Sequence, residues 1–404
     1  MKGKGSSSYS FFIFVLLRKI FNNILEEKLM RDISLYIHIP FCKQKCFYCD
    51  FPSYSGKEEL MNEYIEALSS EILQKGKEYR ISSIFIGGGT PSYLNDSSLE
   101  KLLGTLNKLG LKDNLEFTVE CNPGTLNEKN LSIMKEHNVN RISMGLQSTK
   151  NSLLKDIGRI HSYEEFEENY FLARKLGFNN INADLMFGLP NQTIEDWECS
   201  LKKVAELELD HISAYSLIIE EGTRFYNLYE EDKLNLPEED KERIMYLTTK
   251  DILNGYGYHQ YEISNYSKKN KECFHNKVYW KCDEYLGLGV SASSFIEKKR
   301  IKNIDNIQDY IKRINNKESV IEEIHINDIK DDMEEFLFMG LRMIKGIKLE
   351  EFKERFNKDI YEVYGEIIEK NIKKGLLIHN SGNLYLTSHG IEISNYVMSD
   401  FILS

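Results

Sequence analysis

The sequence predicts an α/β fold, an incomplete (β/α)6 barrel followed by a smaller domain that is mainly helical and winged-helix-like. Strand-like and helix-like segments alternate between Ile33 and Ile219, and this alternation indicates parallel strands joined by right-handed crossovers. The six strand-like segments are too few for a closed eight-fold barrel, so we expect a splayed, open one. After about Asp305 the alternation stops, and helix-like segments with a hairpin take its place.

Each expected strand of the barrel is short and rich in apolar and β-branched residues. In the helical segments, apolar residues recur three or four positions apart, as on one face of a helix. The expected strands cover residues 33–39, 81–86, 115–121, 139–146, 180–187 and 211–219. The expected helices cover residues 58–78, 97–109, 127–137, 163–176 and 193–207. We expect the barrel domain to occupy residues 30–300.

A separate C-terminal domain is expected over residues 301–404. A hairpin over residues 376–386 turns at Ser381-Gly382-Asn383, a sequence suited to a tight turn. Because the chain is acidic, packing or partner docking is a more natural role for this domain than DNA binding. Its expected helices cover residues 305–315, 331–343, 349–355, 360–374 and 388–401.

Charge and cysteine content exclude some classes of function. The chain has 52 Lys and Arg against 63 Asp and Glu, a net charge of −11, so it lacks the basic surface of a nucleic-acid-binding protein. Its seven cysteines are irregularly spaced over 404 residues. This pattern favours reduced thiols and a cytoplasmic location over a disulfide framework.

Residues 1–29 differ from the rest of the chain. The apolar run at 11–17 is only seven residues long, which is too short to span a bilayer. We interpret the segment as a disordered extension or an upstream start ahead of Met30. A peripheral membrane anchor is the alternative.

Three cysteines, Cys42, Cys46 and Cys49, stand in one segment between Pro40 and Pro52. Three thiolates can hold a 4Fe-4S cluster and leave one iron free to bind a small molecule. The spacing is also that of one face of a helix, although charged neighbours and the two prolines oppose a helix. A structural zinc site is a further alternative, but such sites usually have a fourth ligand nearby.

The string LYIHIPFCKQKCFYCDF, residues 35–51, resembles the cluster loop of radical S-adenosylmethionine (SAM) proteins. Within that superfamily it is similar to the coproporphyrinogen-oxidase-like branch, and most of all to the heme-chaperone group of that branch. The resemblance runs from about Met30 to the C-terminus. It implies a partial barrel, a 4Fe-4S cluster on the three cysteines, and SAM bound at the remaining iron.

The segment Gly87-Gly88-Gly89-Thr90-Pro91 follows a strand but is neither a Walker loop nor a dinucleotide fingerprint. Glycines here would let a ligand approach the backbone, although a simple turn is the alternative. The resemblance implies that Gly88, Gly89 and Thr90 hold the methionine part of SAM.

Polar residues also stand at or just after the ends of the later strands, where they are costly to bury unless they are paired. The resemblance implies that they line the SAM pocket, with carboxylates for the ribose or amino group and Arg159 for the carboxylate. Solvated loop residues are the alternative for each one. The expected residues are Glu120, Gln147, Arg159 and Asp184, together with Tyr36 on the first strand and Tyr48 beside the adenine. Cys121 is interpreted as a small buried thiol and not as a fourth ligand.

A second group of residues lies at Cys273-Phe-His275-Asn-Lys-Val-Tyr279-Trp280, which resembles the HNxxYW segment of the heme-chaperone group. A neutral imidazole between aromatic rings could ligate heme iron, so His275 is a predicted heme ligand. A buried structural histidine is the alternative. Downstream, the chain departs from the family pattern, because Ser293 stands where relatives carry a histidine.

Two functions fit these residues. One is a heme chaperone, with heme, a heme-accepting client protein and a protein reductant as partners, and with homodimerisation and peripheral membrane contact as further expectations. The other is oxygen-independent coproporphyrinogen III oxidase, whose members carry a further cysteine two positions after the third ligand. Phe51 occupies that position and favours the chaperone. Whether SAM is cleaved reductively stays open, and a radical methyl-transferring relative is a third possibility.

Overall fold

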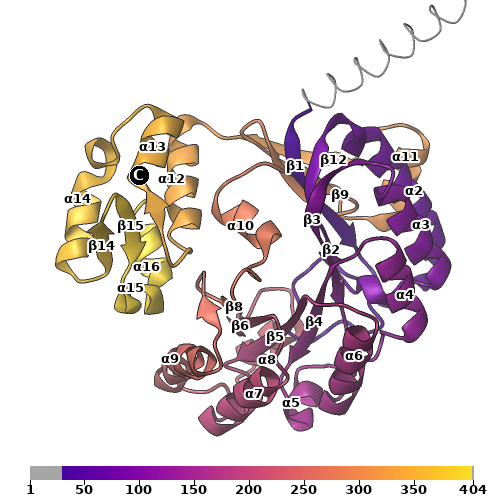
Figure 1. Ribbon diagram of the computed structural model, residues 1–404, viewed down its shortest axis with the longest axis horizontal. Helices are drawn as coiled ribbons and strands as arrows, with labels where there is room; N and C mark the ends of the chain where they lie inside the picture. Colours follow the sequence, from indigo (N-terminus) through magenta and orange to yellow (C-terminus); the bar gives the residue numbers. More distant parts are fainter. Residues whose placement is uncertain (1–29, 403–404) are drawn as a thin grey trace, which may run out of the picture.

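A computed structural model describes residues 30–402, and its main feature is a curved sheet of twelve strands. The six central strands are parallel neighbours in sequence order, as the (β/α)6 prediction requires. They are β1 (Asp32–Ile39), β2 (Arg80–Gly88), β3 (Gly110–Cys121), β4 (Arg141–Gln147), β5 (Ile181–Phe187) and β6 (His211–Ser216). The sheet curves without closing (Figure 1).

Helices cover the outer face of the central strands (Figure 1). Leu35, Ile37 and Ile39 of β1 are fully buried in the core, whereas the alternate residues Tyr36 and His38 face the inside of the barrel. The covering helices are α2 (Met61–Lys75), α3 (Asp96–Leu106), α4 (Glu128–Glu136), α6 (Tyr163–Lys175) and α7 (Ile194–Glu206). Short 3-10 turns η1 (Glu58–Leu60), η2 (Gly76–Glu78) and η3 (Pro91–Tyr93) flank α2 and follow β2.

The helix starts follow local sequence signals. Asn127, Ser162 and Thr193 each accept a hydrogen bond at the start of a helix and form a reciprocal capping box with the residue three positions on. Such boxes satisfy backbone donors that would otherwise lack partners. The helices predicted over 127–137, 163–176 and 193–207 therefore begin within a residue or two of the expected positions.

Beyond the six parallel strands, the sheet has extensions at both ends that the sequence did not predict. Next to β1 lie β9 (Tyr285–Leu288), β10 (Ser293–Ile296), β11 (Lys299–Asn303) and β12 (Ile321–Ile326), and next to β6 lie β8 (Asn265–Ser267) and β7 (His259–Gln260). The added helices are α5 (Asn151–Asp156), α8 (Arg224–Glu230), α9 (Glu239–Gly255) and α10 (Phe274–Trp280), whereas α11 (Ile307–Asn315) is the helix predicted over 305–315. Apart from α9 and α11 these pieces are too short to show a clear periodicity.

The C-terminal part is mainly helical, as predicted. It contains α12 (Ile329–Gly340), α13 (Leu349–Phe356), α14 (Ile360–Lys373), α15 (Ser388–Glu392) and α16 (Ser394–Ser399), with a small sheet of β13 (Ile347–Lys348), β15 (Asn383–Leu386) and β14 (Leu377–Asn380). The single helix predicted over 388–401 is wrong, because Ile393 leaves the helical conformation with φ −116° and ψ 35° and separates α15 from α16.

Two hydrophobic cores indicate where the chain divides. Ile304, Tyr310 and Val320 belong to the core of the large sheet, whereas the second core begins at Met333. A division near residue 327 therefore separates the two cores better than the expected division at 301. The interpretations of residues 1–29 fall outside the residues that the structure describes.

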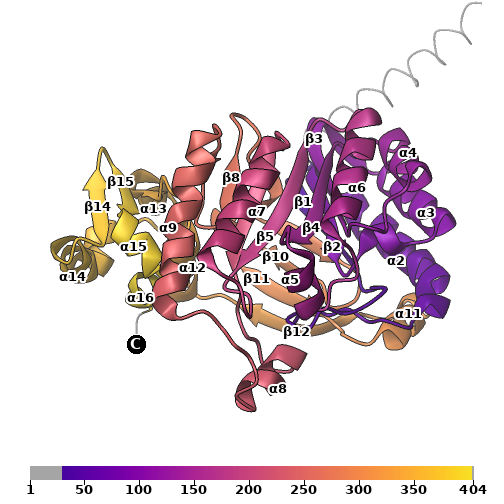
Figure 2. The same ribbon diagram turned by 90° about the horizontal axis from the view of Figure 1, so that it is seen from below.

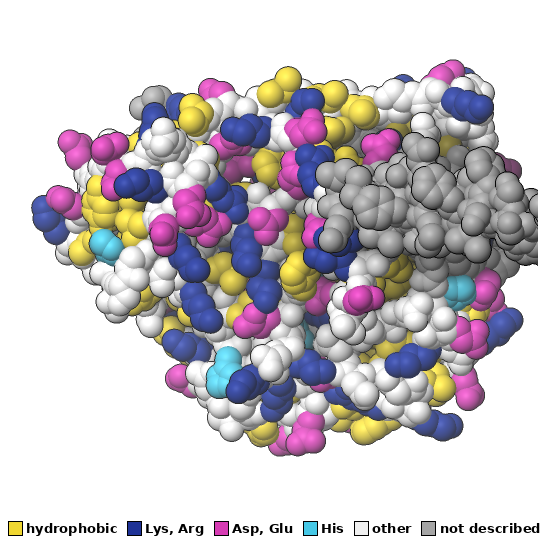
Figure 3. Space-filling model, turned by 45° about the horizontal axis from the view of Figure 1, so that its top comes forward, with side chains coloured by type: hydrophobic (Ala, Val, Ile, Leu, Met, Phe, Trp, Pro, Cys, Tyr) yellow, Lys and Arg dark blue, Asp and Glu magenta, His cyan; other side chains and the backbone are white. Residues whose placement is uncertain are grey.

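Two further observations concern the whole of the described chain. Basic and acidic side chains are interspersed over the face drawn in Figure 3. Within residues 30–402, no helix combines the length and the apolar composition that crossing a bilayer would need.

Candidate functional site

The cysteine loop leaves the carboxyl end of β1 and folds back on itself. The Cys42 amide donates to the Tyr54 carbonyl (3.0 Å), and the Tyr54 amide donates to the Pro40 carbonyl (2.7 Å). The Phe47 amide donates to the Ile157 carbonyl (3.1 Å) and ties the middle of the loop to the end of α5. Residues 40–52 contain no helix, so the alternative of three thiols on one helix face is wrong.

The three thiols lie within one charged neighbourhood. Cys42 is 8% exposed, and Cys46 and Cys49 are half-buried. Burial, and then the negative charge of Cys46, raise the pKa of Cys49 to about 11. Thr90 Oγ1 donates to Cys42 Sγ (3.6 Å), and Arg159 Nη1 donates to Cys46 Sγ (3.3 Å).

The described part of the chain has no group of three or more His, Cys, Asp or Glu side chains placed to hold a single metal ion. The three thiols are thus not arranged as a ready-made zinc site. A four-iron cluster makes a different demand, because each cysteine sulfur binds a different iron and the sulfurs stand farther apart. Cys121 is 5% exposed, belongs to the hydrophobic core and donates to the Val119 carbonyl, as expected for a structural thiol.

The glycine loop lies directly against the cysteine loop. The Gly89 amide donates to the Ile39 carbonyl (2.7 Å), and the Thr90 amide donates to the Phe41 carbonyl (2.8 Å). A Cβ on Gly88 would lie 2.4 Å from the His38 ring, and Gly88 has a φ of +104°. A Cβ on Gly89 would lie 2.7 Å from the Phe41 carbonyl oxygen. Only glycine fits at either position.

Two carboxylates face the inside of the barrel from β3 and β5. Glu120 Oε2 accepts from the Gly88 amide (3.1 Å), and Asp184 Oδ1 accepts from Asn182 Nδ2 (2.7 Å). Burial, and then the charge of Asp184, raise the pKa of Glu120 to about 7. Burial also raises the pKa of Asp184. Glu120 and Asp184, both predicted from their places at strand ends, are therefore close enough to interact electrostatically. Tyr36 belongs to the same group, because burial and the charge of Glu120 raise its pKa.

Arg159 connects this site to the cysteine loop. Its Nη2 donates to Asn122 Oδ1 and to the Gly145 carbonyl, and its Nη1 donates to Cys46 Sγ. Its Nε is buried and has no hydrogen-bond partner among the described residues. A Cβ on Gly145 would lie 2.9 Å from Arg159 Nη2 and 3.1 Å from Gln147 Nε2, so Gly145 leaves room for both side chains. Gln147 ends β4 with a φ of +71°.

Tyr48 lies in an apolar cluster beside the cysteines. Its ring centroid is 6.5 Å from that of Phe225, and the Phe225 amide donates to the Phe47 carbonyl (2.9 Å). The Arg224 guanidinium lies 3.9 Å from the centre of the Phe47 ring. These contacts fix the aromatic residue between the second and third cysteines, while its contact with adenine stays a prediction.

His275 has a structural position that does not support the predicted heme ligation. Its side chain is fully buried, with Nδ1 hydrogen-bonded to Ser83 Oγ (2.9 Å) and Nε2 to Tyr279 Oη (2.9 Å). Its ring stacks on Phe85 at 5.2 Å. Burial, and then the charge of Arg141, lower the pKa of His275 to about 3. Both nitrogens are engaged, so neither is available to iron.

Sequence reasoning missed Glu116, the residue that holds α10 against the barrel. Its carboxylate accepts from the Phe274 amide (2.8 Å), the His275 amide (3.0 Å) and Cys273 Sγ (3.3 Å). A carboxylate at a helix start satisfies free amides and the helix dipole. The signal available in the sequence was the strand alternation, which places Glu116 and Glu120 on the same face of β3.

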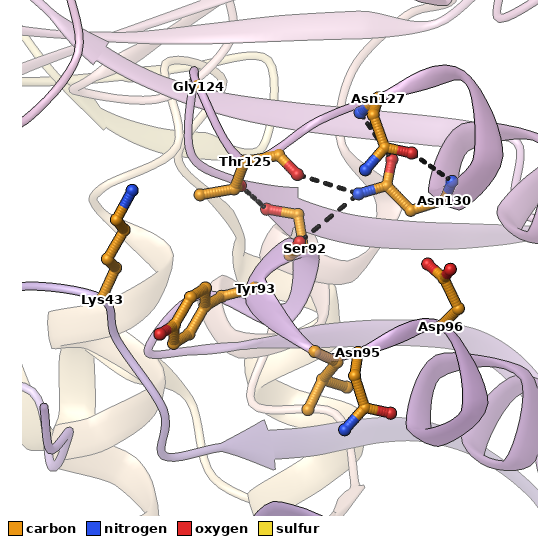
Figure 4. Close-up of a pocket in the computed structure, with 10 residues that line it drawn as sticks. Lys43, Ser92, Tyr93, Asn95, Asp96, Gly124, Thr125, Asn127 and Asn130 are labelled. Carbon is orange, nitrogen blue, oxygen red and sulfur yellow. Dashed lines mark hydrogen bonds between the residues drawn. The ribbon is translucent and has the colours of Figure 1, made fainter. Parts of the chain in front are cut away.

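A polar groove of about 350 Å³ adjoins the glycine loop, with Lys43 of the cysteine loop at its rim (Figure 4). Its lining side chains bond to one another, as Ser92 Oγ does to Thr125 Oγ1 (2.6 Å) and Asn130 Nδ2 to the Thr125 carbonyl (2.9 Å). Asn95 and Asn127 already cap the two helices that begin there. The side chains of Ser92, Asn95, Thr125, Asn127 and Asn130 are therefore already engaged within the groove or at the helix starts.

Comparisons with known proteins agree with this geometry. A family model for the Radical SAM superfamily matches residues 36–204, and one for the HemN C-terminal domain matches residues 328–393. The solved structure of coproporphyrinogen III oxidase (HemN) from Escherichia coli has a TM-score of 0.81 over 92% of this chain and 90% of that one. At 22% identity this similarity shows a shared fold and confirms the predicted fold class.

Closer relatives carry the name heme chaperone HemW. The one from Bacillus subtilis is 37% identical over 91% of this chain and 99% of its own length. The one from Lactococcus lactis is 38% identical over 93% of this chain and 98% of its own length. Membership of the radical SAM superfamily implies a 4Fe-4S cluster and SAM. With the cysteine and glycine loops in contact and relatives that match almost from end to end, the chain belongs to the HemW family of radical SAM proteins.

Proposed function

We propose that this protein is a cytoplasmic heme chaperone that binds SAM at a 4Fe-4S cluster, binds heme and passes the heme to a client protein. The observation that carries the proposal is the near-complete match to two relatives named heme chaperone HemW, at 37% and 38% identity. Phe51 supports it, because the oxidases of the branch resemble this chain but have a further cysteine at that position. The Phe51 side chain is 58% exposed and makes no part of the core.

The residues of the site fit a cluster and SAM. Cys42, Cys46 and Cys49 would hold the cluster, and the buried Arg159 Nε, which lacks a partner in the described chain, gives the SAM carboxylate a donor. A bound, reduced cluster supplies the electron for cleaving a SAM carbon–sulfur bond. The chain itself orients SAM against the Gly88–Gly89 backbone and excludes water from it.

Glu120 and Asp184 give the site its affinity for the positive end of SAM. Burial and the charge of Asp184 raise the pKa of Glu120, so a neighbouring cation would stabilise the Glu120 carboxylate. The ammonium of SAM is such a cation, so we place it at Glu120 and assign Asp184 to the ribose or the amino group. Tyr36, Tyr48 and Gln147 complete the proposed pocket.

Heme requires a separate position, because His275 is closed off by Ser83 and Tyr279. A cavity of about 200 Å³ lies between α10, the β9–β11 strands and α12, and it is lined by aromatic rings. Its lining includes Cys282 and Met339, two side chains whose sulfur can bind iron. A porphyrin is larger than this cavity, so heme binding there requires α12 to move away from α10. Figure 1 shows α10 between the barrel and the C-terminal domain.

A spectral titration of the purified protein with heme tests this assignment. Wild type should give a saturable Soret shift. Cys282→Ser should change the position or the affinity of that shift, whereas His275→Ala should keep its position. A shift that is lost in His275→Ala and kept in Cys282→Ser would restore His275 as the ligand.

Turnover separates the chaperone from the oxidase. Anaerobic incubation with coproporphyrinogen III, reductant and SAM should give no protoporphyrinogen. Robust formation of that product would overturn the chaperone assignment whatever the heme titration shows. The heme-accepting client and the protein that reduces the cluster are the partners that this function requires.

A further inference from the structure

Arg300 of β11 is the one basic residue among the described residues that line the cavity between α10 and α12. Its guanidinium lies 4.4 Å from the centre of the Phe295 ring, and its Nη1 donates to Tyr285 Oη (3.4 Å). Phe295 and Tyr285 belong to β10 and β9, and both line the same cavity. The large sheet therefore positions a cation against aromatic rings, and these contacts do not involve the C-terminal domain.

A carboxylate of the C-terminal domain is paired with Arg300. Arg300 Nε donates to Glu335 Oε1 (2.8 Å) and Nη2 donates to Glu335 Oε2 (2.6 Å), which is the bidentate geometry of a guanidinium with a carboxylate. Glu335 lies on α12, one turn before Met339, which also lines the cavity. The pair thus joins the two sides of the cavity, and Figure 2 shows α12 beside the orange strands β10 and β11.

The two partners of this ion pair separate if the cavity opens. Heme binding in the cavity requires α12 to move away from α10, and Glu335 would move with α12, whereas Arg300 would stay on the sheet with Phe295 and Tyr285. Both side chains of the pair are half-buried, so a guanidinium left without its carboxylate costs free energy. A second carboxylate in the same place recovers that cost. Heme carries carboxylates of this kind on its two propionate side chains.

We propose that Arg300 binds a propionate of heme, and that Glu335 holds this position until α12 moves. The assignment rests on the proposed heme-binding function and adds to it the ligand class, a porphyrin with free carboxylate side chains. The aromatic rings would cover the apolar face of the porphyrin while Arg300 binds its polar edge. Asp283, the acidic residue of the lining, faces Arg355 of α13 (3.4 Å), so a cation already offsets its charge.

A second ion pair on the same helix provides a control. Asp332 lies about one turn before Glu335 on α12 and pairs with Lys298 (2.7 Å). Neither Asp332 nor Lys298 is among the residues that line the cavity. Asp332→Asn therefore loosens α12 from the sheet without removing a carboxylate from Arg300.

Spectral titrations of the purified full chain with heme and with heme dimethyl ester, whose propionates carry no charge, test the assignment. The preference for heme is the dissociation constant of the ester divided by that of heme. This preference should fall by about tenfold or more in Arg300→Gln, because the ion pair with the propionate is lost. Arg300→Lys, which keeps the charge without the bidentate geometry, should give an intermediate preference. Asp332→Asn should keep the wild-type preference, because it acts on both ligands equally.

Glu335→Gln tests the competing carboxylate. It should lower the dissociation constant for heme by about threefold or more, because opening the cavity no longer breaks an ion pair. In the Arg300→Gln background the same change should have no effect on heme, whereas Asp332→Asn should act there as it does in the wild type. Circular dichroism checks that the variants stay folded; Arg300→Lys and Glu335→Gln keep the test open if Arg300→Gln does not.

The outcomes separate this assignment from the proposed function. A preference for heme that is the same in wild type, Arg300→Gln and Arg300→Lys would overturn the assignment while heme binding stands. An increase in the dissociation constant for heme in Glu335→Gln would also overturn it. A protein that gives no saturable shift with either ligand would overturn the proposed heme binding, and the assignment with it.

Discussion

Glu120 should make the protein less stable as the pH rises, and Glu120→Gln should remove this effect. Burial and the charge of Asp184 raise the pKa of Glu120 from its ordinary 4.5 to about 7. A carboxyl with a raised pKa in the folded state keeps its proton there while the unfolded chain loses it. The free energy of unfolding therefore falls between pH 4.5 and about 7 and levels off above that range.

The size of the effect follows from the pKa difference. At 1.36 kcal/mol per tenfold change in proton affinity, a pKa of about 7 instead of 4.5 corresponds to about 3 kcal/mol at pH 8. At pH 5 Glu120 is still mostly protonated in the folded protein, so the loss of unfolding free energy is below about 1 kcal/mol. Glutamine keeps the oxygen that accepts from the Gly88 amide but carries no charge. Glu120→Gln should therefore stabilise the cluster-free protein by about 3 kcal/mol at pH 8 and little at pH 5.

Urea unfolding at the two pH values measures this difference. The fluorescence of Trp197, which is fully buried beside the barrel, reports unfolding of the domain that contains Glu120. Asn182→Asp serves as a contrasting variant, since it adds a carboxyl beside Asp184 and should destabilise more at pH 8 than at pH 5. Equal stabilisation by Glu120→Gln at both pH values, or destabilisation at pH 8, would refute the electrostatic reasoning.

Three further outcomes follow from the same site. SAM affinity should fall by about tenfold per pH unit below about 7, because Glu120 must lose its proton to pair with the ammonium, and calorimetry of Glu120→Gln should give a flatter profile. Gly88→Ala should abolish SAM binding, because the new Cβ would lie 2.4 Å from the His38 ring. Gly382→Ala should bind SAM normally, because Gly382 also has a positive φ (+78°) but no neighbour within 4 Å. His275→Ala should cost about 3 kcal/mol of unfolding free energy by leaving a cavity and unpaired Ser83 and Tyr279 hydroxyls, whereas His379→Ala at the surface should cost little.

The sequence predicted the parts of the fold that repeat. β1 to β6 were recognisable because each contains a short run of apolar and β-branched residues, and the helices that follow carry capping residues such as Ser162 and Thr193. β9, β10 and β11 were not recognisable, because strands of four or five residues have no clear period. Of these three strands, only β9 pairs with β1, and β10 and β11 follow it in the sheet. This arrangement depends on tertiary contacts, as when Glu71 on α2 accepts from the Gly289 amide (2.9 Å) and the Tyr310 hydroxyl (2.6 Å).

The candidate site also has parts that the local sequence indicates and parts that depend on tertiary contacts. The contact between the cysteine and glycine loops follows from parallel pairing, because the carboxyl ends of β1 and β2 lie side by side. The surroundings of His275 were not, because the sequence shows a histidine among aromatic residues but not that Ser83 and Glu116, far away in the chain, close around it. The hydrogen-bond partners of a side chain across the barrel cannot be predicted from the residues next to it in the sequence.

Electron paramagnetic resonance of the reduced, reconstituted protein tests the central claim most directly. With Cys42, Cys46 and Cys49 as the protein ligands of a 4Fe-4S cluster, the spectrum should shift when SAM is added, because SAM binds the remaining iron. Cys121→Ser should show the same shift. A spectrum unchanged by SAM, or a cluster that Cys121→Ser destroys, would contradict the account.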